Sequence, residues 1–185
     1  MKEYEGYIRQ AYELGFSYEH QYRGCAQCTV AAILDALEIP NDHLFRAASG
    51  LASGGGLLCS GSCGGFSGGI MVISSLFGRR RSHFDDDNDF KYSSFRMARD
   101  LQSHFIHTYR SVICNEIHKN IFGRTYNLLD PADKEQFNKD GAHTDKCTSV
   151  VAHAAAWTTE IILKELEAKQ WELTHIYDHQ DLSMQ

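Results

Sequence analysis

A glycine-rich segment over residues 50–69, GLASGGGLLCSGSCGGFSGG, restricts the fold of this chain more than any other part of the sequence. It holds nine of the fifteen glycines and two of the six cysteines. Because glycine has no Cβ, such a backbone can approach a neighbouring group closely and can form concave sets of N–H groups that bind anions. The alternative is a purely structural use, close packing between helices, through Gly64, Gly65, Gly68 and Gly69.

The rest of the chain has helical periodicity, with only two prolines and little strand-like alternation of β-branched residues. We therefore predict an all-α fold, a single-domain helical bundle in which the glycine-rich segment forms a cysteine-bearing loop. A length of 185 residues suits one domain over residues 1–185. Its core is expected over about 22–170, and a tail over 174–185 is expected to fray. The predicted helices are Glu3–Leu14, Cys25–Glu38, His43–Ala52, Cys63–Phe77, Phe90–Asn120 and Asp145–Leu173, with a short helical turn after Pro131.

Charge and hydropathy exclude several classes of partner. The net charge of −6 gives no electrostatic basis for binding nucleic acid or an anionic membrane surface. Charged residues interrupt the first sixteen positions, so no secretory signal is visible. The longest apolar run, Ile70–Phe77, is far shorter than the roughly 20 residues that span a bilayer. These features predict a cytoplasmic protein without a membrane span.

The cysteines are the candidate chemical groups. In a reducing compartment six cysteines are not expected to form structural disulfides, and two close pairs among them favour metal binding or redox chemistry. Thiolates are stabilised at the N-termini of helices, and Cys25, Cys63 and Cys147 fall at or near predicted helix starts. Three such placements suggest a shared anionic centre. The six are Cys25, Cys28, Cys59, Cys63, Cys114 and Cys147.

Several familiar motifs fit less well. Cys25 and Cys28 lie one helical turn apart, but a thioredoxin-type pair belongs after a strand in a βαβ unit, which is not predicted here. Thr29 occupies the position at which c-type haem attachment requires histidine. His118 follows Cys114 by four residues and could share its helix face, although such histidines more often pack in the core or lie at the surface.

In their order along the chain these features resemble the redox-active protein family named for its C_GCAxxG_C_C cysteine pattern. The first element is Cys25 in GCAQCTVAAIL, and the second is Cys63 in CGGFSGG. The later single cysteines match Cys114 and Cys147, the latter in DKCTSVVAHAA. The resemblance runs from Tyr22 to Leu163, and the small positions of the motif correspond to Gly64, Gly65 and Gly68.

The resemblance implies an iron–sulfur protein that stores or transfers electrons. Proteins of this family typically come from anaerobes, and a related module occurs in split-Soret cytochromes, where an iron–sulfur centre is associated with the non-haem cysteines. By this resemblance a [4Fe–4S] or [2Fe–2S] cluster is held by cysteine, with the matched glycines beside it. Gly65 replaces the usual alanine, and no CxxCH for c-type haem is present. The implied ligands are Cys25, Cys63, Cys114 and Cys147, and the additional Cys28 and Cys59 replace one ligand or support a larger or second cluster.

Two other classes remain open. One is a metal-free thiol–disulfide oxidoreductase or sensor that uses Cys25 with Cys28, or Cys59 with Cys63. The other is a non-catalytic partner subunit with a structural metal such as zinc. If the protein is an enzyme, we expect an oxidoreductase that works with a redox partner protein. A homodimer is also expected, through an apolar stripe formed by Phe95, Leu101, Phe105, Ile106, Tyr109 and Ile113.

Overall fold

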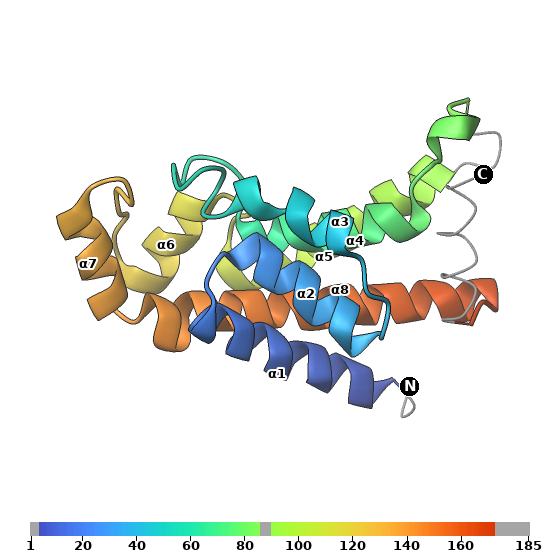
Figure 1. The fold of residues 1–185 in the computed structure, drawn as a ribbon, viewed down its shortest axis with the longest axis horizontal. Helices are drawn as coiled ribbons and strands as arrows, with labels where there is room; N and C mark the ends of the chain where they lie inside the picture. Colours follow the sequence, from blue (N-terminus) through green and yellow to red (C-terminus); the bar gives the residue numbers. More distant parts are fainter. Residues whose placement is uncertain (1–3, 86–89, 173–185) are drawn as a thin grey trace.

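A computed structural model describes residues 4–85 and 90–172 (Figure 1). These residues form helices and connecting loops, with an isolated β-bridge between Ser62 and Ile113 but no strand. The predicted all-α fold is confirmed. The elements are α1 (Glu5–Gln21), α2 (Cys25–Ala36), α3 (Asp42–Ala47), η1 (Ser49–Leu51), α4 (Gly64–Phe77), η2 (Arg81–His83), α5 (Phe90–Tyr109), α6 (Cys114–Phe122), α7 (Pro131–Lys139), η3 (Ala142–Lys146) and α8 (Cys147–Lys169).

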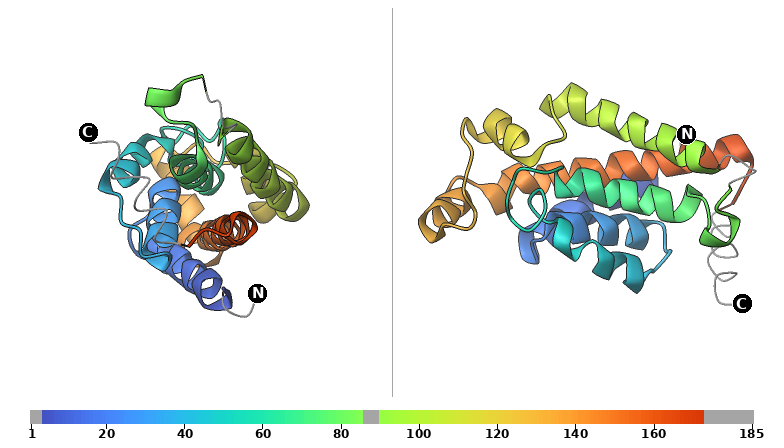
Figure 2. Two further views of the ribbon diagram at one scale, coloured as in Figure 1. Left: turned by 90° about the vertical axis from the view of Figure 1, so that its right-hand side faces the viewer. Right: turned by 90° about the horizontal axis from the view of Figure 1, so that it is seen from above.

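The long helix α8 runs along most of the bundle and contacts α1, α2, α4 and α5 (Figures 1 and 2). Its sequence is rich in alanine, and small side chains let the neighbouring helices come close. Gly15 of α1, for example, lies against Ala152 and Ala155 of α8, where a Cβ would be only 3.1 Å from the Ala152 Cα atom. The sequence predicted that this helix ends at Leu14, before Gly15. The packing of Gly15 against α8 explains why α1 continues to Gln21.

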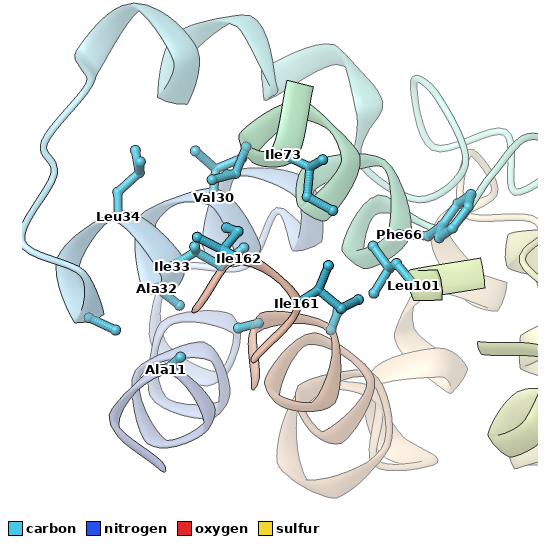
Figure 3. Packing of buried hydrophobic residues seen from close by; sticks show 14 of the residues in the cluster. Ala11, Val30, Ala32, Ile33, Leu34, Phe66, Ile73, Leu101, Ile161 and Ile162 are labelled. Carbon is cyan, nitrogen blue, oxygen red and sulfur yellow. The ribbon is translucent and has the colours of Figure 1, made fainter. Parts of the chain in front are cut away.

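The core is built from aliphatic side chains that recur at helical spacing. Ile33 of α2, Ile73 of α4, Leu101 of α5 and Ile162 of α8 are all fully buried and meet between the helices (Figure 3). Burying each such side chain contributes about 1.5–3 kcal/mol to stability. No helix among residues 4–85 and 90–172 combines the length and the apolarity that crossing a membrane requires.

The predicted helix Phe90–Asn120 is wrong, because the chain divides it into α5 and α6. Arg110 takes a left-handed conformation (φ 62°), and Val112 accepts a hydrogen bond from the Cys63 N–H at 2.7 Å. The Asn120 side chain donates to the Tyr109 carbonyl at 2.7 Å and so covers the end of α5. Cys114 is therefore the first residue of a helix and does not lie inside a long one.

The other helix boundaries agree more closely with the sequence. The turn after Pro131 is confirmed as α7, whose first turn is capped by the Asp130 side chain. The last helix does not start at the predicted Asp145, since the π-helical turn η3 precedes Cys147 and begins after Gly141. The predicted end of this helix at Leu173 is wrong, because α8 ends at Lys169 and Gln170 follows in a left-handed conformation (φ 55°). The predicted frayed tail lies outside the described residues. Both α6 and α7 lie at one end of the bundle (Figures 1 and 2).

Helix α4 crosses α2 so closely that its glycines cannot carry side chains. A Cβ on Gly68 would lie 2.7 Å from the Ala26 carbonyl oxygen and 3.1 Å from the Thr29 Cβ. We predict that Gly68→Ala destabilises the protein by about 1–3 kcal/mol, the usual cost of overpacking. Gly6→Ala in α1 is the matched control, because nothing lies within 4 Å of its Cβ position. Urea denaturation of both variants checks this, and equal midpoints would contradict the close crossing.

Candidate metal centre

The four cysteines of the pattern, far apart in the sequence, line one cavity of about 30 Å³. The starts of α2, α4 and α6 meet the N-terminal part of α8 there, close to the glycine-rich loop. The remaining lining includes both polar and apolar side chains. The cysteines are Cys25, Cys63, Cys114 and Cys147, and the other lining residues are Glu19, Ser53, Ile117, His118, Phe137, His143, Val150 and Val151.

All four of these cysteines stand at the start of a helix, Cys147 as the first residue of α8. Cys25 and Cys114 are the first residues of α2 and α6, and Cys63 is the N-cap of α4. The unpaired N–H groups and the dipole of a helix start favour a negatively charged sulfur. Cys147 differs, because its N–H donates to the Ala142 carbonyl within the π-helical turn.

Backbone N–H groups also point at two of the sulfurs. The Ser53 N–H donates to the Cys25 Sγ at 3.3 Å, and the Gly64 N–H donates to the same atom. The Gly65 and Phe66 N–H groups donate to the Cys63 Sγ. A Cβ on Gly64 would overlap the Cys25 sulfur, so only glycine fits at this position. The start of α4 therefore supplies both a thiol and the donors that surround it.

Gly65 and Gly68 lie where α4 packs closely against neighbouring helices. A Cβ on Gly65 would come 3.1 Å from the Ala154 Cβ of α8, and Gly68 faces α2. Close helix packing, the alternative raised from the sequence, therefore accounts for the lack of a side chain at both positions. A role of these glycines beside a cofactor stays a proposal. The observation that supports it is the hydrogen bond from the Gly65 N–H to the Cys63 sulfur.

The glycine-rich loop is tied to the start of α6 by its backbone. The Cys114 N–H donates to the Gly61 carbonyl at 2.9 Å, and the Asn115 N–H donates to the Cys59 carbonyl at 2.9 Å. Cys59 itself is buried in a left-handed conformation (φ 58°). A residue other than glycine adopts this conformation only where its surroundings enforce it. These hydrogen bonds hold Cys59 beside Cys114.

The electrostatics of the site keep most of these thiols neutral. All six cysteines are free thiols. Burial raises the pKa of Cys63 to about 11, although N–H donors act in the opposite direction. Burial also raises the pKa of Cys25 and of Cys147 well above the ordinary value. The hydrogen bond between Cys114 and Cys59 lowers the pKa of Cys59 to about 5 and raises that of Cys114.

Cys28 is turned away from this centre. Its Sγ donates to the Arg23 carbonyl at 3.1 Å, and Cys28 is not among the residues that line the cavity. Burial and the nearby Glu19 carboxylate raise the pKa of Cys28 above its ordinary value. The CxxC spacing therefore does not bring both of its sulfurs to the site.

Sequence reasoning gave little weight to His118 and missed Glu19 and His143. The His118 Nε2 lies 3.6 Å from the Cys114 Sγ and 3.9 Å from the Cys147 Sγ. Its spacing of four residues from Cys114 was the available signal. Glu19 is buried, with its Oε1 3.2 Å from the His143 Nδ1, and nothing in the local sequence marks it.

The convergence of four cysteines from separate helices on one buried cavity defines a helical protein with a cysteine-based redox or metal centre. The chain belongs to the family described as "Putative redox-active protein (C_GCAxxG_C_C)", whose pattern matches residues 24–161. Neither a curated protein nor a solved structure is detectably similar to the chain. The resemblance to this family seen in the sequence is confirmed.

Metal binding at this centre is expected to depend on pH. Thiols whose pKa is raised by burial are protonated at neutral pH, and a bound metal ion requires their thiolates. Binding must therefore release protons, so affinity for Zn²⁺ should increase between about pH 6 and about pH 8. Titration of apo-protein in weak buffer with a pH indicator measures this release. Binding without proton release would show that the thiols are already ionised.

Proposed function

We propose that the protein is an iron–sulfur redox protein that stores or transfers electrons. The observation that carries the proposal is the meeting of Cys25, Cys63, Cys114 and Cys147 at one cavity. Four thiolates are the usual donor set of both [2Fe–2S] and [4Fe–4S] clusters. When bound, a cluster supplies reversible one-electron chemistry at this place.

The residues around the cavity suit such a centre. Hydrogen bonds to ligand sulfurs and the exclusion of water are the main means by which a protein sets the potential of a cluster. Here the N–H groups of Ser53, Gly64 and Gly65 supply such hydrogen bonds. Apolar side chains of the lining exclude water on one part of the cavity, namely Ile117, Phe137, Val150 and Val151.

Electron exchange would take place on the more open part of the site. Cys25 and Cys147 are partly exposed, whereas Cys63 and Cys114 are buried. A redox partner protein is therefore expected to approach the surface near Cys25 and the glycine-rich loop. We also propose a cytoplasmic location, because that compartment keeps cysteines in the reduced state that metal binding requires.

The proposed homodimer would use a smaller surface than the sequence suggested. Leu101, Phe105 and Tyr109 of the apolar stripe are buried in the core of the chain itself. Phe95 and Ile106 remain exposed on α5 and are the residues of the stripe that a second copy could cover.

A thiol–disulfide oxidoreductase is the second candidate, and one observation favours it. Cys59 has a pKa lowered to about 5 by its hydrogen bond from Cys114, so it would be a thiolate at neutral pH. Its burial limits access by a disulfide substrate. The Cys25–Cys28 pair suits this chemistry less, because burial raises the pKa of both thiols.

Two serine variants on the same helix test the cluster. Cys25→Ser removes a thiol from the cavity, so it should lose most of the bound iron and acid-labile sulfide and lower the melting temperature, since metal binding is coupled to folding. Cys28→Ser, three residues further along α2, should retain both. The measurements are iron, sulfide and the visible spectrum after anaerobic purification.

The colour of the wild-type protein and a third variant, Cys59→Ser, separate the two candidate functions. A colourless wild-type protein whose disulfide-reductase turnover depends on Cys59 would reject the cluster in favour of the dithiol. Equal iron content in Cys25→Ser and wild type would remove Cys25 from the ligand set.

A further inference from the structure

We propose that Cys59, Cys114 and His118 form a second metal subsite, which binds one divalent transition-metal ion such as Zn²⁺ or Fe²⁺. The four-cysteine pattern leaves Cys59 and His118 without a role. The subsite adjoins the proposed cluster site and shares Cys114 with it. The subsite rests on the proposed function only in that the Cys114 thiolate would also bind the proposed cluster.

The distances within this group suit one ion. The two sulfurs and one ring nitrogen all lie within 4.8 Å of one another, and all three residues are buried. In a tetrahedral site with Zn–S near 2.3 Å and Zn–N near 2.0 Å, neighbouring ligand atoms are about 3.5–3.8 Å apart. The Cys114 Sγ and the His118 Nε2 are 3.6 Å apart. A metal ion could therefore enter with little movement of these side chains.

The surroundings of His118 are unusual for a core histidine. Three aromatic rings surround its imidazole, those of Phe122, Tyr126 and Phe137. Its Nδ1 is buried without a hydrogen-bond partner, and its Nε2 faces cysteine sulfurs. A buried polar group costs free energy unless it is satisfied, and sulfur is a weak hydrogen-bond partner. A metal ion on Nε2 would give that nitrogen a stronger partner than sulfur, whereas Nδ1 would still lack a partner among the described residues.

The loop conformation holds Cys59 at the same point. Its φ of 58° is enforced on both sides of the residue, because its N–H donates to the Ser53 carbonyl at 2.8 Å and its carbonyl accepts from the Asn115 N–H at 2.9 Å. Asn115 is the second residue of α6 and follows Cys114 directly. The backbone thus holds Cys59 and Cys114 next to each other, and the side chains bring their sulfurs within 4.8 Å.

The donor set defines the chemistry of the subsite. Two thiolates and a neutral imidazole balance the charge of a divalent ion, which suits a buried position. Soft thiolates and imidazole together select zinc or iron over magnesium or calcium. Three protein ligands leave one tetrahedral position open, as in metal sites that bind water or a substrate. The subsite would therefore hold a small exchangeable ligand next to the redox centre.

Cobalt is the probe for this subsite. Protein purified anaerobically with its cluster is titrated with Co²⁺, and the absorption bands of tetrahedral thiolate-bound cobalt are recorded together with total iron, zinc and sulfide. Wild type should hold one divalent ion beyond the cluster iron. Cys59→Ser and His118→Gln should each weaken this binding at least tenfold, since even changes outside the ligand set weaken metal sites by about 10- to 100-fold. Cys59→Ser should also keep its iron and sulfide, because Cys59 does not line the cavity of the proposed cluster.

Matched controls are Cys28→Ser, whose sulfur faces Arg23, and His104→Gln, whose ring stacks on Trp157. Both should bind cobalt as wild type does. If circular dichroism shows that His118→Gln does not fold, cobalt binding by Cys59→Ser alone tests the subsite. Cobalt binding that is unchanged in Cys59→Ser overturns the subsite.

Cys25→Ser distinguishes failure of the subsite from failure of the proposed cluster. It should lose iron and sulfide but still bind one Co²⁺ that depends on His118. If wild type holds no sulfide but binds cobalt through His118, the cluster proposal fails and the subsite stands. If wild type holds the cluster and binds no further ion, the subsite is overturned.

Discussion

The close crossing of α2 and α4 is the contact on which the centre depends. Gly64 and Gly68 allow the two backbones to approach until the N–H groups at the start of α4 reach the Cys25 sulfur. A single added methyl group at either position would separate the helices. The same crossing brings Cys63, at the start of α4, to the cavity that Cys25 lines. Glycine is thus needed here for two reasons. It lets α2 and α4 approach closely, and it leaves the Gly64 N–H free to reach the Cys25 sulfur.

Burial and hydrogen bonding shift the pKa values of the thiols in opposite directions. Helix starts and N–H donors favour the thiolate, whereas the apolar surroundings favour the neutral thiol and win at Cys25, Cys63 and Cys147. A positive ion changes this balance, because it compensates the charge that burial disfavours. The cavity is therefore arranged for thiolates that exist only together with a cation.

Much of the fold could be predicted from local sequence, and the failures have physical causes. The predicted starts of α2 at Cys25 and of α4 at Cys63 agree with the structure to within one residue. The break between α5 and α6 depends on hydrogen bonds to the glycine-rich loop, about fifty residues earlier in the chain, which periodicity cannot reveal. Likewise, the burial of Glu19 depends on how α1 packs, and its own helix pattern gives no sign of it.

The distribution of the cysteines over four helices has a consequence for how the protein is made. Cys147 belongs to α8, the last helix described and the one on which α1, α2, α4 and α5 all pack. Until the ribosome releases that helix, the earlier thiols have neither their fourth partner nor the core that shields them. A nascent chain can therefore neither assemble the site nor protect its cysteines from oxidation. A metal of the proposed centre would therefore bind only after α8 has left the ribosome, and the thiols stay open to oxidation until then.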